Sequence, residues 1–188
     1  MAVETIYKTK NESGRYSCGD IGITTEEWYG LLCNDKAESY IDTLLAFMRE
    51  PQHCGTCSAI AQKYNCPAQH YNAKVTNFAK WVQKKLGRFR VIGTDGNDTF
   101  WAIVMQEGWD TKQGFKWQLR NELVSALRVY LMKDLIDRFR NGSPFNGYDE
   151  AYKWQLIDDA EGASSIEIVK KMIGKNIIDN MRVDSVLK

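Results

Sequence analysis

The sequence of 188 residues predicts a mainly α protein with a small β-sheet. Apolar residues recur at helical spacing in several separate segments, and short strand-like runs flank an Asp-Gly turn at residues 95–96. Hydrophobic residues make up 44% of the chain, which is enough for a packed core. We interpret the fold as a winged-helix-like domain followed by a helical C-terminal segment.

The chain divides into four predicted parts. Residues 1–22 are polar, contain three glycines and have no helical period, so we expect a flexible arm. Residues 23–140 form the winged-helix-like domain. Residues 141–149 form a linker, because Asn-Gly-Ser-Pro is a strong loop signal. Residues 150–188 form a helical connector.

Two helices open the predicted domain. Thr24 has the side chain of an N-cap, and two glutamates follow it in the first turn, where the helix dipole favours acids. The next helix covers about residues 36–49, where a stripe of apolar residues faces a core and Pro51 ends the helix.

A helix-turn-helix is predicted next. The third helix starts at residues 55–56 and ends near Tyr64. Pro67 suits the first position of the fourth helix, which runs to Leu86 and ends at Gly87.

Strands and a last helix complete the predicted domain. Residues 89–92 and 99–105 are predicted as the two strands of a wing, joined by a tight turn at 93–98. Residues 115–119 alternate apolar and polar side chains, as a third strand does, and residues 121–140 have the period of a long helix.

Charge is segregated along the chain. The net charge is only +1, yet residues 51–94 contain no Asp and no Glu. The same stretch carries seven basic residues: Lys63, Lys74, Lys80, Lys84, Lys85, Arg88 and Arg90. A local basic surface of this kind is typical of proteins that bind nucleic acid, so double-stranded DNA is the predicted partner.

A helical wheel separates the fourth helix into two faces. Its apolar face faces the core, and the opposite face carries amides, small residues and lysines. Amide side chains can pair with adenine in the major groove, and lysines suit phosphates. The predicted DNA-binding residues, including the base of the wing, are Gln69, His70, Asn72, Ala73, Thr76, Asn77, Lys80, Lys84, Arg88 and Arg90.

Other chemistry remains open in the same region. His53, Cys54, Cys57, Cys66 and His70 include four candidate zinc ligands around one C-x2-C pair. Asp98, Asp110 and Lys112 match the loose spacing of metal-dependent nucleases. Trp101, Trp109, Phe115 and Trp117 suit either a cage for a flipped base or a core layer under the predicted wing.

The sequence has no secretory signal and no apolar run of membrane-spanning length. Five cysteines, an odd number, favour reduced thiols, so we expect a cytoplasmic protein that has no membrane partner. Nucleotide-binding and hydrolase motifs are absent. We therefore expect neither enzymatic activity nor a cofactor, with any GTPase or nuclease activity outside this chain.

Several segments resemble the N-terminal DNA-recognition module of bacterial McrB-like AAA+ restriction proteins. The similarity covers about residues 23–188. It is carried by residues 23–32 (Ile-Thr-Thr-Glu-Glu-Trp-Tyr-Gly-Leu-Leu), 55–57 (Gly-Thr-Cys), 69–72 (Gln-His-Tyr-Asn), 78–80 (Phe-Ala-Lys) with Val82, 115–123 (Phe-Lys-Trp-Gln-Leu-Arg-Asn-Glu-Leu) and 152–157 (Tyr-Lys-Trp-Gln-Leu-Ile).

The resemblance implies a part in restriction or phage defence, in which this domain selects DNA, often modified DNA. An AAA+ motor or nuclease would then lie beyond Lys188 or on another chain. The alternative hypothesis is a protein-interaction module of a bacterial defence complex, in which the predicted wing and the 150–188 helices contact a partner and the basic face does not touch DNA.

Overall fold

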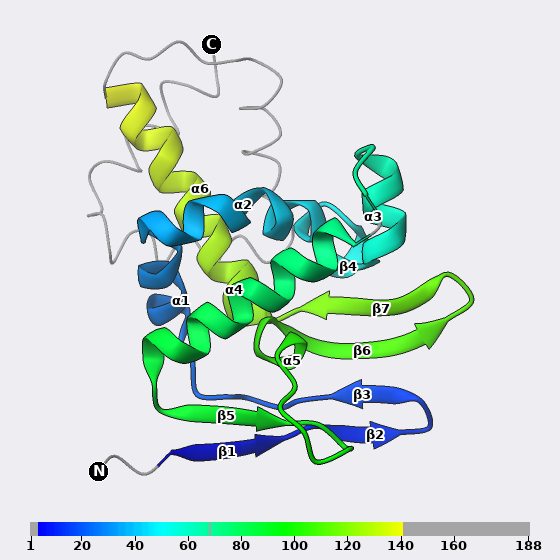
Figure 1. Ribbon diagram of the computed structural model, residues 1–188. Helices are drawn as coiled ribbons and strands as arrows, with labels where there is room; N and C mark the ends of the chain where they lie inside the picture. The colour runs from blue at the N-terminus through cyan, green and yellow to red at the C-terminus, as the bar shows by residue number, and fades with distance from the viewer. Residues whose placement is uncertain (1–3, 68, 141–188) are drawn as a thin grey trace. The chain divides into compact units, whose positions relative to one another are not determined.

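A computed structural model describes residues 4–67 and 69–140 (Figure 1). The chain forms two compact units, Met1–Val124 and Ser125–Lys188, which are described separately. The division falls inside the long helix at residues 121–140, upstream of the predicted linker. That linker, at 141–149, and the helical connector at 150–188 lie outside the described residues.

The described helices include every helix predicted before residue 141. They are α1 (Thr25–Leu32), α2 (Asp35–Met48), the short 3-10 helix η1 (Pro51–His53), α3 (Cys57–Lys63), α4 (His70–Leu86), α5 (Trp101–Val104) and α6 (Asn121–Arg140). Thr24 caps α1 as predicted, since its hydroxyl accepts from the Glu27 amide and the Glu27 carboxylate accepts from the Thr24 amide. Gly87 ends α4 with φ of 61°, a conformation that glycine adopts at low cost.

The strands form two small sheets (Figure 1). β1 (Thr5–Lys8) and β5 (Phe89–Ile92) pair in parallel. The five-stranded antiparallel sheet has the order β2 (Lys10–Glu12), β3 (Arg15–Ser17), β6 (Met105–Thr111), β7 (Gly114–Leu119) and β4 (Cys54–Thr56). The fold is therefore mixed α/β, with helices and a small antiparallel sheet.

The prediction of a flexible arm at residues 1–22 is wrong for Thr5–Lys8 and Lys10–Ser17. These segments form β1, β2 and β3, and Thr5 pairs with Phe89 while Tyr16 pairs with Gly108. The strands are three or four residues long and mostly exposed, so they show no alternation of apolar and polar residues. Their backbone groups instead bond to strands that lie far away in the sequence.

The predicted wing is also wrong. Its turn forms, because the Gly93 amide donates to the Asn97 carbonyl over 2.7 Å, but residues 101–104 are the helix α5 and not a strand. Ala102, Ile103 and Val104 are all fully buried, and a short apolar run of this kind does not distinguish strand from helix. The long antiparallel hairpin is β6–β7, whose turn lies at residues 111–114.

A buried arginine joins α5 to the N-terminal segment. The Arg120 guanidinium donates to the carbonyls of Ala102 (2.6 Å) and Ile103 (3.0 Å), near the C-terminus of α5. It also donates to the carbonyls of Cys18 (3.3 Å) and Gly19 (2.9 Å), which follow β3. Helix C-termini carry unpaired carbonyls and a partial negative charge, and this cation satisfies both.

Candidate nucleic-acid interface

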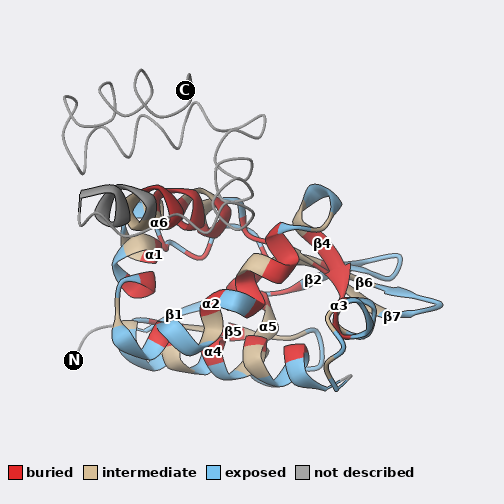
Figure 2. Ribbon diagram, turned by 90° about the horizontal axis from the view of Figure 1, so that it is seen from above, coloured by how far each residue is buried: buried red, intermediate tan, exposed pale blue. Residues whose placement is uncertain are grey.

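The orientation of α4 is fixed by its buried stripe. Phe78 is fully buried, and its ring centroid lies 5.4 Å from that of Tyr40 and 6.3 Å from that of Trp28. Val75 and Val82 are fully buried on the same stripe. The apolar face of the wheel is therefore confirmed, and the opposite side of α4 is turned to solvent (Figure 2).

The predicted DNA-binding residues of α4 and its cap lie on the solvent side of the helix. We call them the α4 face: Gln69, His70, Asn72, Ala73, Thr76, Asn77, Lys80 and Lys84. Thr76 is half-buried and the other seven are exposed. The face combines amide groups near the start of the helix with ammonium groups near its end, which separates groups suited to base edges from groups suited to phosphates.

The connection into α4 is longer than a compact helix-turn-helix turn. It runs from Tyr64 to Gln69, where the compact motif uses about three or four residues. Pro67 was predicted to be the first helical residue, but α4 begins at His70, whose amide donates to the Pro67 carbonyl over 2.9 Å. Thus α3 and α4 are consecutive helices joined by an extended turn.

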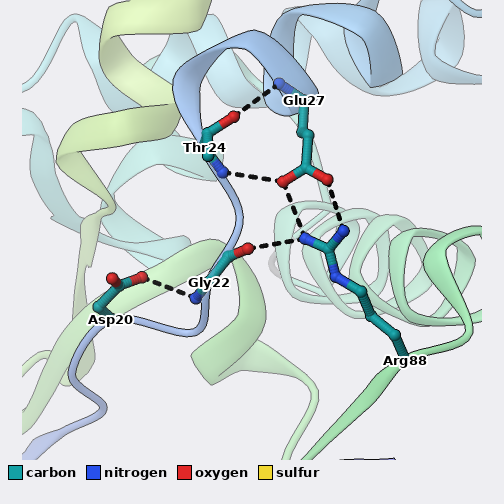
Figure 3. A network of polar contacts seen from close by, with 5 residues as sticks. All are labelled: Asp20, Gly22, Thr24, Glu27 and Arg88. Atoms are coloured by element: carbon teal, nitrogen blue, oxygen red, sulfur yellow. Dashed lines mark hydrogen bonds and ion pairs between the residues drawn. The ribbon is translucent and has the colours of Figure 1, made fainter. Parts of the chain in front are cut away.

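Arg88, one of the predicted DNA-binding residues, is held by α1 (Figure 3). Its guanidinium donates to both carboxylate oxygens of Glu27, over 2.5 and 2.8 Å, and to the Gly22 carbonyl over 2.7 Å. The same Glu27 carboxylate closes the capping box with Thr24. Arg88 therefore connects the end of α4 to the start of α1 and is not a free phosphate ligand.

The network around Arg88 predicts a pH-dependent contribution to stability. The hydrogen bond from Arg88 lowers the pKa of Glu27, aided by the Thr24 amide. A carboxyl group with a lowered pKa contributes stability that is present above its unfolded-state pKa and lost as the pH falls through the folded value. Replacing Glu27 with glutamine should cost about 1 kcal/mol or less at neutral pH, because the pair is partly exposed.

Urea unfolding at several pH values measures this contribution. The difference between the wild type and Glu27→Gln should shrink as the pH falls below 4.5, the ordinary pKa of the group. A difference that stays constant from neutral to acidic pH would contradict the assignment.

Arg90 is likewise paired, with the turn that follows β5. It donates to Asp98 through Nε over 3.0 Å and through Nη2 over 2.8 Å to each carboxylate oxygen. Asp95, at the tip of the same turn, accepts hydrogen bonds from Asn97, which lower its pKa. The two arginines at the base of the predicted wing therefore serve the fold and are not gathered with the α4 face.

Lys80 and Lys84 of the α4 face differ from these two arginines, because neither has an acidic partner among the described residues. Lys80 and Lys84 lie around a pocket with two further lysines and a tryptophan, and we call this group the lysine pocket: Lys36, Lys80, Trp81, Lys84 and Lys85. Within the described part of the chain, none of these four lysines forms an ion pair. The Lys80 ammonium lies 5.0 Å from the centroid of the Phe100 ring.

Sequence reasoning did not assign Lys36 and Lys85 to the site. Lys36 comes from the first turn of α2, more than thirty residues before α4 in the chain, so only the packing of the two helices reveals its place. Lys85 lies beside the wheel's polar face. The absence of carboxylates over residues 51–94 was the one signal that included Lys85.

The aromatic residues near β6 and β7 form mainly a packing layer. Phe115 contacts the rings of Trp101 (5.6 Å between centroids) and Trp117 (6.3 Å), and Trp117 is buried. Trp109 is in a separate environment, with the Arg15 and Lys116 cations each 5.5 Å from its ring. This arrangement favours the core-layer interpretation over a cage for a flipped base.

The candidate metal sites do not assemble. Among the side chains that the structure describes, in residues 4–67 and 69–134, no three from His, Cys, Asp or Glu converge so as to hold a metal ion. Burial raises the pKa of the Cys57 thiol to about 12, which disfavours the thiolate that zinc requires. Asp98, of the loose nuclease pattern, is paired with Arg90.

No protein-family model, curated protein or solved structure gives a significant match to this chain. In the part of the chain that the structure describes, no helix is both long and apolar enough to span a bilayer. The features that bear on function are therefore the geometry and charge of the α4 face and the resemblance of the sequence segments.

Proposed function

We propose that this chain binds double-stranded DNA through the α4 face, as the recognition part of a bacterial restriction or defence system. The observation that carries the proposal is the pairing of charges. In the described chain, the ion pairs of the basic stretch join Arg88 to Glu27, Arg90 to Asp98 and Lys63 to Glu50, while Lys80 and Lys84 form none and are exposed on one helix face.

Each part of the α4 face has a chemical role in this proposal. Lys80 and Lys84 contact phosphates and position the helix. Gln69, Asn72 and Asn77 offer amides that pair with adenine edges, and Ala73 leaves room for close approach. The buried apolar stripe packs α4 against the core, so packing sets the backbone positions from which these groups extend.

Because residues 101–104 form a helix, the winged-helix interpretation needs a different wing. We propose that α3 and α4 act as the helix pair and that the β6–β7 hairpin takes the place of the predicted wing. The turn of this hairpin is anchored to α3, because the Ser58 hydroxyl donates to the Gln113 carbonyl over 2.9 Å. Lys112 and Lys116 give the hairpin basic side chains beside that contact.

Duplex binding at several salt concentrations tests the proposal. Fluorescence anisotropy with a labelled duplex should give an affinity that falls steeply between about 50 and about 200 mM salt, with a slope of about −0.9 in log–log form for each phosphate contacted. Two to four lysine contacts predict a slope of about −2 to −4. Absence of binding at the lowest salt would refute the proposal.

The interaction-module alternative makes the opposite prediction. Negligible DNA binding at every salt concentration, together with co-purification of a protein encoded by a neighbouring gene, would favour it. A role in defence, an AAA+ motor partner and a cytoplasmic location are supported by the sequence resemblance and composition and stay predictions.

A further inference from the structure

The lysine pocket contains a tryptophan, Trp81, which has no role in the proposed binding of duplex DNA. Its volume is about 440 Å³, within the range of about 300–1,000 Å³ that small ligands occupy. Lys36 from α2 supplies one ammonium group, and Lys80, Lys84 and Lys85 from α4 supply three more. Among the described residues, Trp81 is the one other side chain that lines it.

The charges of this pocket match an anion. In the described chain no carboxylate side chain lines it, and its four lysines line one hollow without an ionic partner. Like charges in one hollow repel each other, and an anionic group that enters relieves this repulsion. A phosphodiester group has the appropriate charge.

Trp81 adds a flat apolar surface to the cationic lining. Its ring stacks on that of Phe78, with centroids 5.7 Å apart and planes inclined by 26°. Phe78 is fully buried, so it supports Trp81 from the core side, while Trp81 itself is half-exposed. Base–tryptophan stacking beside a basic groove is the usual means of binding single-stranded nucleic acid.

The described lining of the pocket offers little to read a base edge. It contains no amide, hydroxyl or carboxylate side chain, so these residues do not select a base by the pairings that amides, hydroxyls and carboxylates make. Inside a duplex, moreover, neighbouring base pairs cover both faces of each base, so Trp81 cannot stack on an internal paired base. Charge and stacking together therefore favour an unpaired nucleotide of any sequence.

We infer that the lysine pocket binds an unpaired nucleotide of DNA, with its phosphate among the lysines and its base stacked on Trp81. The inference rests on the proposed function, since the α4 face shares Lys80 and Lys84 with the pocket. It adds a preference: the protein binds a duplex that continues into a single strand in preference to a blunt duplex.

Three probes and the full chain test this preference at one fixed low salt concentration. The probes are a blunt duplex, the same duplex with a thymidine extension of about four nucleotides, and a blunt duplex lengthened by the same number of base pairs. The extension should tighten binding about 10-fold, as one stacked base does, whereas added base pairs should not.

Substitutions assign the gain to the pocket. Trp81→Leu should reduce the affinity ratio of extended to blunt duplex to about 1, because leucine keeps apolar contact with Phe78 but cannot stack on a base. Trp109→Leu is the matched control, since Trp109 is a partly exposed tryptophan on β6, and should keep the ratio near 10. Lys36→Glu with Lys85→Glu changes only exposed residues and should also lower the ratio.

The outcomes separate this inference from the proposed function. Equal affinity for extended and blunt duplexes, or an unchanged ratio in both pocket variants, would overturn the inference and leave duplex binding intact. Failure of the wild type to bind any of the three probes would overturn the proposed function itself.

Discussion

Replacing Arg120 with methionine should lower the free energy of unfolding by about 3 kcal/mol or more. The side chain is 3% exposed and donates to four backbone carbonyls. Methionine fills a similar volume but leaves these carbonyls without donors, and each buried unpaired acceptor costs about 1–3 kcal/mol. The carbonyls left without donors lie at the C-terminus of α5 and in the segment after β3, which Arg120 joins.

Urea unfolding followed by tryptophan fluorescence measures the effect. Arg15→Met is the matched control, because Arg15 is an exposed arginine in a surface ion pair with Glu107, and such pairs contribute about 1 kcal/mol or less. Arg120→Lys should lie between the two, since one ammonium group cannot reach all the acceptors that a guanidinium reaches. Equal stability losses in Arg120→Met and Arg15→Met would show that the buried network contributes little.

The role of Arg120 illustrates what sequence alone could not predict. A lone arginine after strand-like residues gives no sign that it caps a helix, and residues 101–104 were themselves expected to be a strand. The capping interaction requires that α5 forms, and α5 forms where the surrounding structure buries its apolar residues. Local sequence patterns show neither that residues 101–104 form a helix nor that Arg120 caps it. Each of these two features can be recognised only once the other is known.

The longer helices, by contrast, could be predicted from local patterns. The apolar stripe of α4 repeats at the helical period, and Gly87 and Thr24 are standard helix-end residues, so the buried face of α4, its C-terminus and the start of α1 follow from short-range chemistry. The edge strands β1–β3 lack such a pattern. Their positions are set by pairing with β5 and β6, which are some ninety residues away in sequence.

The candidate site lies between these two cases. Its face was predictable because it is the complement of the buried stripe on the same helix. Which of the basic residues remain unpaired was not predictable, because the sequence gives Arg88 and Lys84 the same formal charge. Only the fold brings Glu27 to Arg88 and Asp98 to Arg90, while it gathers Lys36 with the unpaired lysines of α4.

Exchanging Lys80 and Lys84 for glutamate should weaken duplex binding at low salt by about 100-fold or more. Each lost phosphate contact removes the release of about one counterion, and each new carboxylate repels the backbone. The slope of log affinity against log salt should therefore become shallower by about 2. Both side chains are exposed, so the unfolding transition should not change.

A charge-matched control separates contact from general electrostatics. Lys8→Glu with Lys10→Glu makes the same change in net charge at exposed residues of β1 and β2, which lie outside the α4 face. If the α4 face touches DNA, the control should keep the wild-type slope and lose affinity only weakly. Equal losses and equal slopes in the two double variants would mean that the protein attracts DNA through its total charge, and the α4 face would then have no special part in binding.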